Sequence, residues 1–473
     1  MLTFILVGSG LLNHNGVRNV EKIQVNLLAR QELYYPKEPN KFELYHREFN
    51  EKLMIESSDW DTFNTHDPHI FKDEVSGYYY IYSTDLGKPG IHIRKSADLI
   101  NWEFVGTGLL DGVPQEAHEW SQASGLWAPD MIKVGDEYRS YYSASTFGSQ
   151  QSCIGLAVAT HPEGPFTHKG LVVKSAADAP VNAIDANLVL DHETGDQYLV
   201  YGSFWGGIRM LKLDVTTGFV AEDGFGICLA CRPREGVDTS VEGAYVVYND
   251  ETGYYYLFVS YGSLSSDYNV RVGRSKKITG PYIDYHGKAL TTMDEEPNRI
   301  GFKLTTGYKF GDHPGWFALG HNSVLKDDGN WYLIHHTRPE VGPKWPYLHV
   351  RKMVFSRDGW PLVSPERFAG EFLQPISAEA LVGSYERIEF DPLTSDIITT
   401  SNRADFKQDG TCLMNEIMGT WSVEEGNRLM INLQGVVEEH VVMTAWDFEA
   451  WKPTIVTTGK NNEGICRWMK QVD

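Results

Sequence analysis

The chain has few cysteines, few basic residues and no long apolar run. Its 473 residues include 42 lysines and arginines against 63 aspartates and glutamates, which gives a formal net charge of -21. This excess of negative charge repels phosphate backbones and anionic lipid surfaces, so we do not expect nucleic acid or membrane as a partner. The same charge disfavours a polyanionic substrate but is compatible with a neutral sugar as the substrate.

The scarcity of cysteine excludes a disulfide scaffold. The five cysteines are dispersed and odd in number, which favours a reducing compartment. Cys228-Leu-Ala-Cys231 has the spacing of a redox or metal pair, but no second pair or nearby histidine accompanies it. Incidental thiols are therefore the simpler interpretation of this motif.

Targeting and membrane signals are weak. The apolar run 2–7 has no lysine or arginine before it and no clear cleavage site after it, which makes it a poor signal peptide. Nothing else approaches the roughly 18 apolar residues of a membrane span. We expect a cytoplasmic protein, with secretion as the alternative.

One unit recurs five times, and its spacing predicts the fold. Each unit begins with a polar residue before an apolar strand, followed by a turn, a tyrosine-rich strand and one or two further strands. The units open at residues 66–71, 127–132, 184–189, 241–245 and 320–324. Four short strands per unit of roughly 50 residues, without helical periodicity, are typical of a β-propeller.

The polar residues at the start of the units distinguish a propeller from a β-sandwich. They are Asp67, Asp130, Asp185, Glu242 and His321. The innermost strand of every propeller blade lines the central channel, so these side chains would converge there. A sandwich would not explain their recurrence.

We therefore predict an all-β protein, a five-bladed β-propeller followed by a small C-terminal β-barrel or sandwich. Residues 1–60 would form an N-terminal extension packed on the propeller, residues 61–375 the propeller, and residues 378–473 the second domain, where short alternating strands replace the repeat. Two domains also suit the length of the chain.

Two of the converging carboxylates suit the cleavage of a glycosidic bond, which needs one carboxylic acid and one carboxylate. Asp67 and Glu242 lie on units one and four and would face each other across the channel. An inverting enzyme holds its carboxyls roughly 6.5–9.5 Å apart in this way. Asp185, between them, would favour the protonated form of Glu242. Each aspartate alone is more simply a turn residue, but their recurrence at one place favours a function.

Six segments then carry a resemblance to the arabinanases of glycoside hydrolase family 43. They are His66-Asp67-Pro68, Leu126-Trp127-Ala128-Pro129-Asp130, Asn182-Ala183-Ile184-Asp185, Tyr201-Gly202-Ser203-Phe204-Trp205-Gly206-Gly207-Ile208, Val241-Glu242-Gly243 and Gly320-His321-Asn322-Ser323. The resemblance implies that Asp67 is the general base, Glu242 the general acid and Asp185 the residue that tunes and orients this acid. It also implies net inversion at the sugar.

The resemblance further implies substrate contacts at Trp127, Asn182, Ser203, Trp205 and Arg338. Trp205 would stack on a sugar face, with a core tryptophan as the alternative. Arg338 would donate to the base or to sugar hydroxyls, with a surface ion pair as the alternative.

His321 resembles a histidine that helps hold a central calcium ion in related arabinanases, largely through water. Because calcium prefers oxygen ligands, such a site is unusual. The alternative is a hydrogen-bonded structural histidine.

The expected substrate is neutral α-1,5-linked L-arabinan or its oligosaccharides. The alternatives are arabinofuranosidase or β-xylosidase activity on the same scaffold and a non-catalytic sugar-binding propeller. Retention of all three carboxylates speaks against the last. Endo or exo action depends on loops, here residues 34–63 and 291–317. The sequence leaves this choice and the oligomeric state open.

Overall fold

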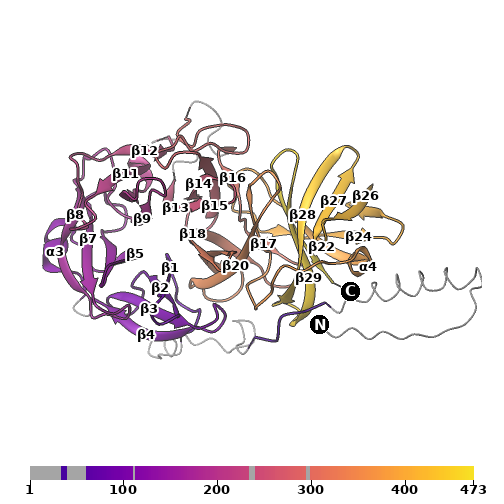
Figure 1. Ribbon diagram of the computed structural model, residues 1–473, viewed down its shortest axis with the longest axis horizontal. Helices are drawn as coiled ribbons and strands as arrows, with labels where there is room; N and C mark the ends of the chain where they lie inside the picture. Colours follow the sequence, from indigo (N-terminus) through magenta and orange to yellow (C-terminus); the bar gives the residue numbers. More distant parts are fainter. Residues whose placement is uncertain (1–32, 40–59, 110–111, 234–239, 294–298, 473) are drawn as a thin grey trace, which may run out of the picture.

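The computed structural model describes residues 33–39, 60–109, 112–233, 240–293 and 299–472, which are built almost entirely of β-strands (Figure 1). The helices among them are short: α3 (Gln115–Ser121), α4 (Ala378–Leu381) and the 3-10 turn η2 (Phe204–Gly206). The all-β class expected from the strand repeats is confirmed. Within these residues no helix is long and apolar enough to span a bilayer.

Three four-stranded antiparallel sheets come first along the chain. Their strands are β1 (His69–Lys72), β2 (Tyr79–Ser83), β3 (Ile91–Ser96) and β4 (Glu103–Gly108); β5 (Trp127–Val134), β6 (Glu137–Ala144), β7 (Ser152–Ala159) and β8 (Thr167–Ser175); and β9 (Asn187–Leu190), β10 (Gln197–Tyr201), β11 (Ile208–Leu213) and β12 (Ile227–Ala230).

The fourth and fifth repeats share a ten-stranded sheet, joined where Asn269 pairs in parallel with Leu319. Its strands are β13 (Glu242–Asn249), β14 (Tyr254–Tyr261), β15 (Asn269–Ser275), β16 (Phe302–Lys303), β17 (Tyr308–Lys309), β18 (Trp316–Asp327), β19 (Asn330–Pro339), β20 (Tyr347–Phe355), β21 (Pro361–Val363) and β23 (Thr399–Thr400). The tyrosine-rich second strands are buried on both faces, as β14 illustrates with seven buried residues out of eight. Such strands read as continuous apolar runs.

The first strands of the repeats, β1, β5, β9, β13 and β18, contact one another in chain order, and β18 also contacts β1. These contacts form a closed circuit around the middle of the larger part of the molecule (Figure 1). Four of the five polar residues expected to converge, Asp67, Asp185, Glu242 and His321, are thereby brought to one place. The expectation is wrong for Asp130, which lies within β5 and accepts hydrogen bonds from the Asn187 side chain and the Leu188 amide.

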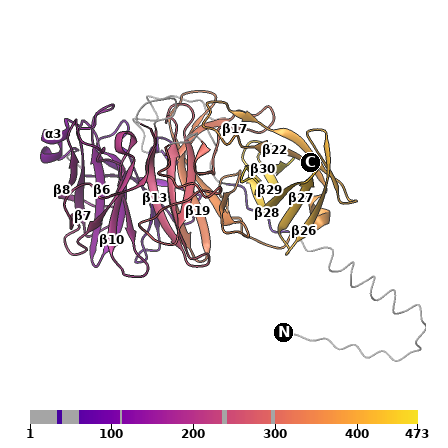
Figure 2. The same cartoon turned by 90° about the horizontal axis from the view of Figure 1, so that it is seen from above.

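The C-terminal part is a closed eight-stranded barrel, so the barrel alternative is confirmed over the sandwich. It consists of β22 (Gly383–Glu389), β24 (Asn402–Phe406), β25 (Thr411–Met414), β26 (Ile417–Glu424), β27 (Arg428–Leu433), β28 (Val436–Asp447), β29 (Lys452–Asn461) and β30 (Cys466–Gln471). The barrel lies at one end of the molecule (Figure 2).

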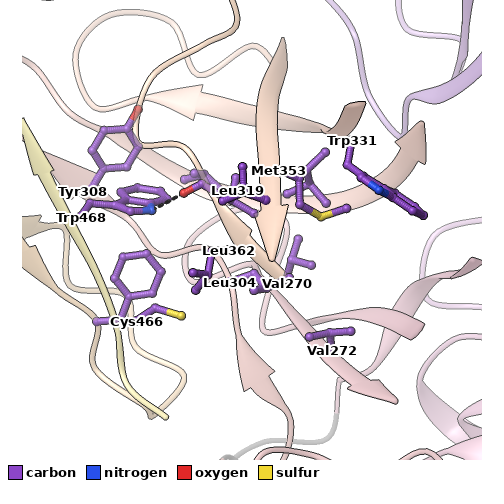
Figure 3. Close-up of a cluster of buried hydrophobic side chains, with 14 of the residues drawn as sticks. Val270, Val272, Leu304, Tyr308, Leu319, Trp331, Met353, Leu362, Cys466 and Trp468 are labelled. Atoms are coloured by element: carbon purple, nitrogen blue, oxygen red, sulfur yellow. Dashed lines mark hydrogen bonds between the residues drawn. The ribbon is translucent and has the colours of Figure 1, made fainter. Parts of the chain in front are cut away.

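One cluster of buried apolar side chains continues from the repeats into the barrel (Figure 3). The ring of Trp468 on β30 packs edge-on against Tyr308 on β17, with centroids 5.2 Å apart. Its indole N–H donates a hydrogen bond of 2.6 Å to the Val363 carbonyl. Because this core is shared, the two parts support each other.

Of the expected N-terminal extension, the structure describes residues 33–39. They lie against the barrel, where Leu33 and Tyr35 pack on its core and the Glu38 carboxylate accepts a 2.7 Å hydrogen bond from the Trp451 indole. The apolar run 2–7 lies outside the described residues.

Candidate active site

A pocket of about 510 Å³ opens where the first strands converge. It is lined by all nine residues that the sequence predicts for the site: Asp67, Trp127, Asn182, Asp185, Ser203, Trp205, Glu242, His321 and Arg338. The structure therefore brings the predicted constellation together from five separate repeats. A larger cavity of about 630 Å³ lies against the barrel; there Asp284 is held by the amides of His286, Lys288 and Gly301, which indicates a structural role.

Unusual backbone geometry aims the charged side chains into the pocket. Asp67, Asp185 and His321 have positive φ values of 52°, 60° and 49°, a conformation that is uncommon for non-glycine residues. Strand pairing is irregular between Glu242 and Tyr245 and on both sides of Gly320. Such bulges re-aim side chains at the ends of strands.

Asp67 is held as a carboxylate. Its Oδ2 accepts hydrogen bonds from Thr84 (2.6 Å) and His66 (2.7 Å), and its Oδ1 lies 2.9 Å from Nδ1 of His321. Burial alone would raise the pKa of Asp67, but the neighbouring His321 and His66 hold it well below its usual range. Asp67 is therefore ionised at neutral pH.

The pKa of Glu242 is shifted in the opposite direction. It is 9% exposed, and burial raises the pKa of its carboxyl, with a further contribution from the charge of Asp67. Ser203 donates a 2.8 Å hydrogen bond to Oε2 of Glu242. This bond and the nearby Tyr268 oppose the rise without cancelling it.

Asp185 interacts electrostatically with both Asp67 and Glu242. Burial, Glu242 and Asp67 raise its pKa to about 7, although His321 opposes them. Its Oδ2 accepts a 3.2 Å hydrogen bond from the amide of Gly243, the residue after Glu242. Because Asp185 and Glu242 repel each other when both are ionised, burial and this repulsion together favour a proton on the pair.

His321 is the cation among these carboxylates. Burial favours the neutral imidazole, but Asp67, Asp185 and Glu242 raise the pKa of His321 to about 9. Its amide donates a 2.8 Å hydrogen bond to Ser260 Oγ. His321 therefore carries a positive charge at neutral pH and faces the predicted base.

Sequence reasoning missed several residues that support Asp67. Thr84 and His66 bond its carboxylate, and the ring of His336 stacks on His66 at 4.2 Å. Tyr268 stacks on the other side of the site, 5.6 Å from His336. Adjacency in the His66-Asp67-Pro68 motif could have indicated His66, but Thr84 and Tyr268 carry no local signal.

The predicted substrate contacts differ in how firmly they are held. Arg338 donates from Nε to the Leu264 carbonyl at 2.9 Å and from its terminal nitrogen to the Lys344 carbonyl. Trp205 is half-buried in η2, so its ring is not a core tryptophan. At the rim of the same pocket, Phe147 is 89% exposed and adds a second aromatic face.

The described residues offer few oxygen ligands for calcium near His321. The three-ligand groups found among them are His66, Asp67 and His336, and Glu366, Asp447 and Glu449. Lys470 already neutralises the second group, with its Nζ 2.5 to 2.9 Å from the three carboxylates. His321 belongs to neither group. Three carboxylates do face His321, so the charge of the site suits a cation held mostly through water.

Comparison with known proteins supports a carbohydrate-active site. The profile of glycosyl hydrolases family 43 matches residues 62–361, and that of a C-terminal lipocalin-like domain matches residues 365–469. An extracellular endo-α-(1→5)-L-arabinanase of Thermotoga petrophila is 32% identical over 454 residues, covering 86% of this chain and 93% of that protein. An extracellular exo-α-(1→5)-L-arabinofuranosidase of Cellvibrio japonicus is 30% identical, over 63% of this chain and 86% of that protein.

Solved structures agree with these sequence relatives. The crystal structure of the endo-1,5-α-L-arabinanase of Thermotoga petrophila superposes with a TM-score of 0.79 at 30% identity, covering 88% of this chain and all of that one. The α-L-arabinanase of Cellvibrio cellulosa complexed with arabinohexaose superposes with a TM-score of 0.56 at 30% identity, covering 64% and 96%.

The comparisons correct the expected location. Relatives that match 86% of this chain are extracellular enzymes, which overturns the expectation of a cytoplasmic protein. That expectation rested on an odd number of cysteines and on the weak apolar run 2–7. A large core of strands needs no disulfides, so the scarcity of cysteine does not report the compartment.

Proposed function

Because the chain belongs to glycosyl hydrolases family 43, we propose that it hydrolyses α-1,5-linked L-arabinan with inversion, on a five-bladed β-propeller whose axis carries the site. The closed circuit of first strands supports the propeller. The observation that carries the function is the opposite shift of two carboxyl pKa values in one pocket, well below its usual range at Asp67 and above it at Glu242. Carboxyls driven apart in this way mark a base and an acid.

The proposed reaction uses Asp67 and Glu242 on opposite sides of the sugar. Glu242 gives its proton to the glycosidic oxygen of the leaving sugar, while Asp67 takes a proton from the water that attacks the anomeric carbon. Because Ser203 donates to Oε2 of Glu242, the proton to be transferred resides on Oε1. After cleavage Asp67 is protonated and Glu242 ionised, and exchange with solvent restores both.

The neighbouring residues hold these states and the substrate. His321 keeps Asp67 ionised through its positive charge, and Asp185 holds the amide of Gly243 beside Glu242. Trp205 and Trp127 offer faces on which sugar rings stack. Asn182 and Arg338 offer polar groups to the sugar hydroxyls. A calcium ion held mostly through water near His321 would add positive charge beside Asp67 and would favour the neutral form of this imidazole.

We propose endo action and secretion, since the relatives that extend over the C-terminal domain are extracellular endo-arabinanases. The exo-acting relative covers a smaller share of this chain. The neutral polymer also suits the net charge of -21.

The test is a comparison of linear arabinan with aryl α-L-arabinofuranosides and β-xylosides. Rapid loss of viscosity with few new reducing ends would support endo cleavage of arabinan. Release of the aryl group alone would support the arabinofuranosidase or xylosidase alternatives, and binding without turnover of any substrate would support a sugar-binding propeller. Proton NMR of the first product should show the inverted anomer; the retained anomer would exclude the proposed roles of Asp67 and Glu242.

A further inference from the structure

The two cysteines of the Cys228-Leu-Ala-Cys231 motif differ from the other three in the chain. Both are partly exposed, whereas Cys153, Cys412 and Cys466 are buried. Cys228 lies on the edge strand β12, and Cys231 follows directly after that strand ends. Reagents can therefore reach this pair, while the remaining thiols lie within the sheets.

A β-bulge brings the two thiols to the same side of the chain. Residues three apart on a regular strand point to opposite faces. In β12, however, Ala230 pairs with Ile208 and Cys228 with Arg209, so Leu229 is an extra residue. This extra residue restores a common face. The Cys228 thiol donates to the Ala230 carbonyl at 3.6 Å and the Cys231 thiol to the Thr291 carbonyl at 3.5 Å, and the two sulfurs are close enough to shift each other's pKa.

The chemistry of the pair is asymmetric. The neighbouring Cys231 thiol, with a contribution from Arg209, lowers the pKa of Cys228 to about 7, while the Cys228 sulfur raises the pKa of Cys231. Burial raises the pKa of Cys153 and Cys466 to about 12 and that of Cys412 to about 11. A reactive thiol beside a second one is the arrangement of an attacking and a resolving cysteine.

The pair lies directly behind the turn that carries Trp205. Arg209, opposite Cys228, donates from Nε to the Gly206 carbonyl at 3.1 Å. A Cβ on Gly207 would lie 2.8 Å from both Cα and Cβ of Cys231. The backbone of η2 and its flank therefore rests on the cysteine motif.

We propose that Cys228 and Cys231 form a disulfide that braces the Trp205 turn from behind. With a low-molecular-weight disulfide such as glutathione disulfide as oxidant, the Cys228 thiolate attacks one sulfur and releases one thiol. The Cys231 thiolate then attacks the Cys228 sulfur and releases the second thiol. The protein loses two electrons and two protons, which the oxidant gains as two thiols. This proposal differs from the simpler interpretation of the two residues as incidental thiols.

The test is mass spectrometry of the full-length chain after treatment with glutathione disulfide. We expect a loss of about 2 Da relative to the reduced protein. Of the five free cysteines, only the three outside the pair should then be alkylated after denaturation, and peptide mapping should place the bridge within the motif. Five alkylated cysteines, or a lasting glutathione adduct on Cys228, would overturn the proposal.

Variants at one cysteine at a time distinguish the attacking thiol from the resolving thiol. Cys231→Ser should retain glutathione on Cys228, because the resolving thiol is gone, whereas Cys228→Ser should react little with either oxidant or alkylating reagent in the folded state. Equal reactivity of the two variants would contradict the assigned order of attack.

The expected effect of the disulfide on the Trp205 turn rests on the proposed function, and it is measured separately through the enzyme kinetics. The oxidised protein should show a KM for arabino-oligosaccharides about two- to fivefold lower than the reduced protein, with kcat little changed, because a pre-ordered Trp205 turn loses less entropy on binding. The double variant Cys228→Ser/Cys231→Ser should not respond to oxidation. An unchanged KM would remove the bracing role. Absence of all hydrolysis would instead refute the proposed function, while the mass measurement would still decide the disulfide.

Discussion

At the scale of single residues, the site depends on carboxyls that share a pocket and titrate differently. Glu242→Gln keeps the shape of the acid but cannot donate a proton, so we expect kcat on arabinan to fall by about a thousandfold. A substrate with an excellent leaving group needs little protonation and should lose much less. Asp67→Asn is the matched variant: it should be equally inactive on both substrates, because both need an activated water. Similar losses on both substrates in Glu242→Gln would argue against its role as the acid.

Asp185→Asn tests the charge balance around Glu242. Burial and the charge of Asp67 raise the pKa of Glu242, Asp185 and Glu242 interact through their charges, and the active form needs Glu242 protonated. Removing one negative neighbour lowers that pKa, so the alkaline limb of the kcat profile should move down by about one pH unit. The acidic limb, which reports Asp67, should move less. An unmoved alkaline limb with full activity would reduce Asp185 to a turn residue.

His321→Gln should affect the acidic limb of the pH profile of activity. The positive charge of His321 lowers the pKa of Asp67, so its loss should raise that pKa and move the acidic limb of the activity profile to higher pH. Chelation tests the calcium proposal separately. If His321 helps to hold an ion, EDTA should depress the wild-type activity, calcium should restore it, and the variant should respond to neither. A wild type indifferent to EDTA would exclude an essential, removable calcium ion.

At the scale of elements, the starts of the first strands place the reactive groups. Gly243 on β13 has a φ of 58°, and a Cβ there would lie 3.0 Å from Cγ of His321. Gly243→Ala should therefore strain the backbone beside Glu242 and displace the imidazole. We expect a fall in kcat of about tenfold to a hundredfold with a smaller change in thermal stability. Gly435→Ala in the barrel, at a φ of 98° with open space around it, shares the backbone strain but should leave kcat unchanged.

At the scale of the whole molecule, the repeats and the barrel share one core. Trp468→Ala removes a fully buried ring that packs on Tyr308 and bonds Val363. The free energy of unfolding should fall by about 3–5 kcal/mol, measured by urea denaturation. Met418→Ala, on an exposed barrel strand, should change it by less than about 0.5 kcal/mol. If the two variants were equally stable, the barrel would be an independent appendage.

The sequence by itself determined the strand repeats, the all-β class and the candidate residues Asp67, Asp185, Glu242 and His321. These features are local, because each unit opens with a polar residue before an apolar strand, and burial on both faces of β14 leaves a continuous apolar run. Local patterning of this kind survives in the order of the residues.

Only the tertiary structure decided which groups touch. Thr84, directly after β2, and Tyr268, directly before β15, reach the site from loops, and no local pattern sets them apart. Burial raises the pKa of both Asp67 and Glu242, but His321 and His66 contact the Asp67 carboxylate and reverse the shift there. The C-terminal strands form a closed barrel, although alternating strands were equally compatible with a sandwich. The bulge at Leu229 places the two thiols of the Cys228-Leu-Ala-Cys231 motif on the same side of the chain. Contacts between residues far apart in the chain decide such features, and composition and periodicity do not encode them.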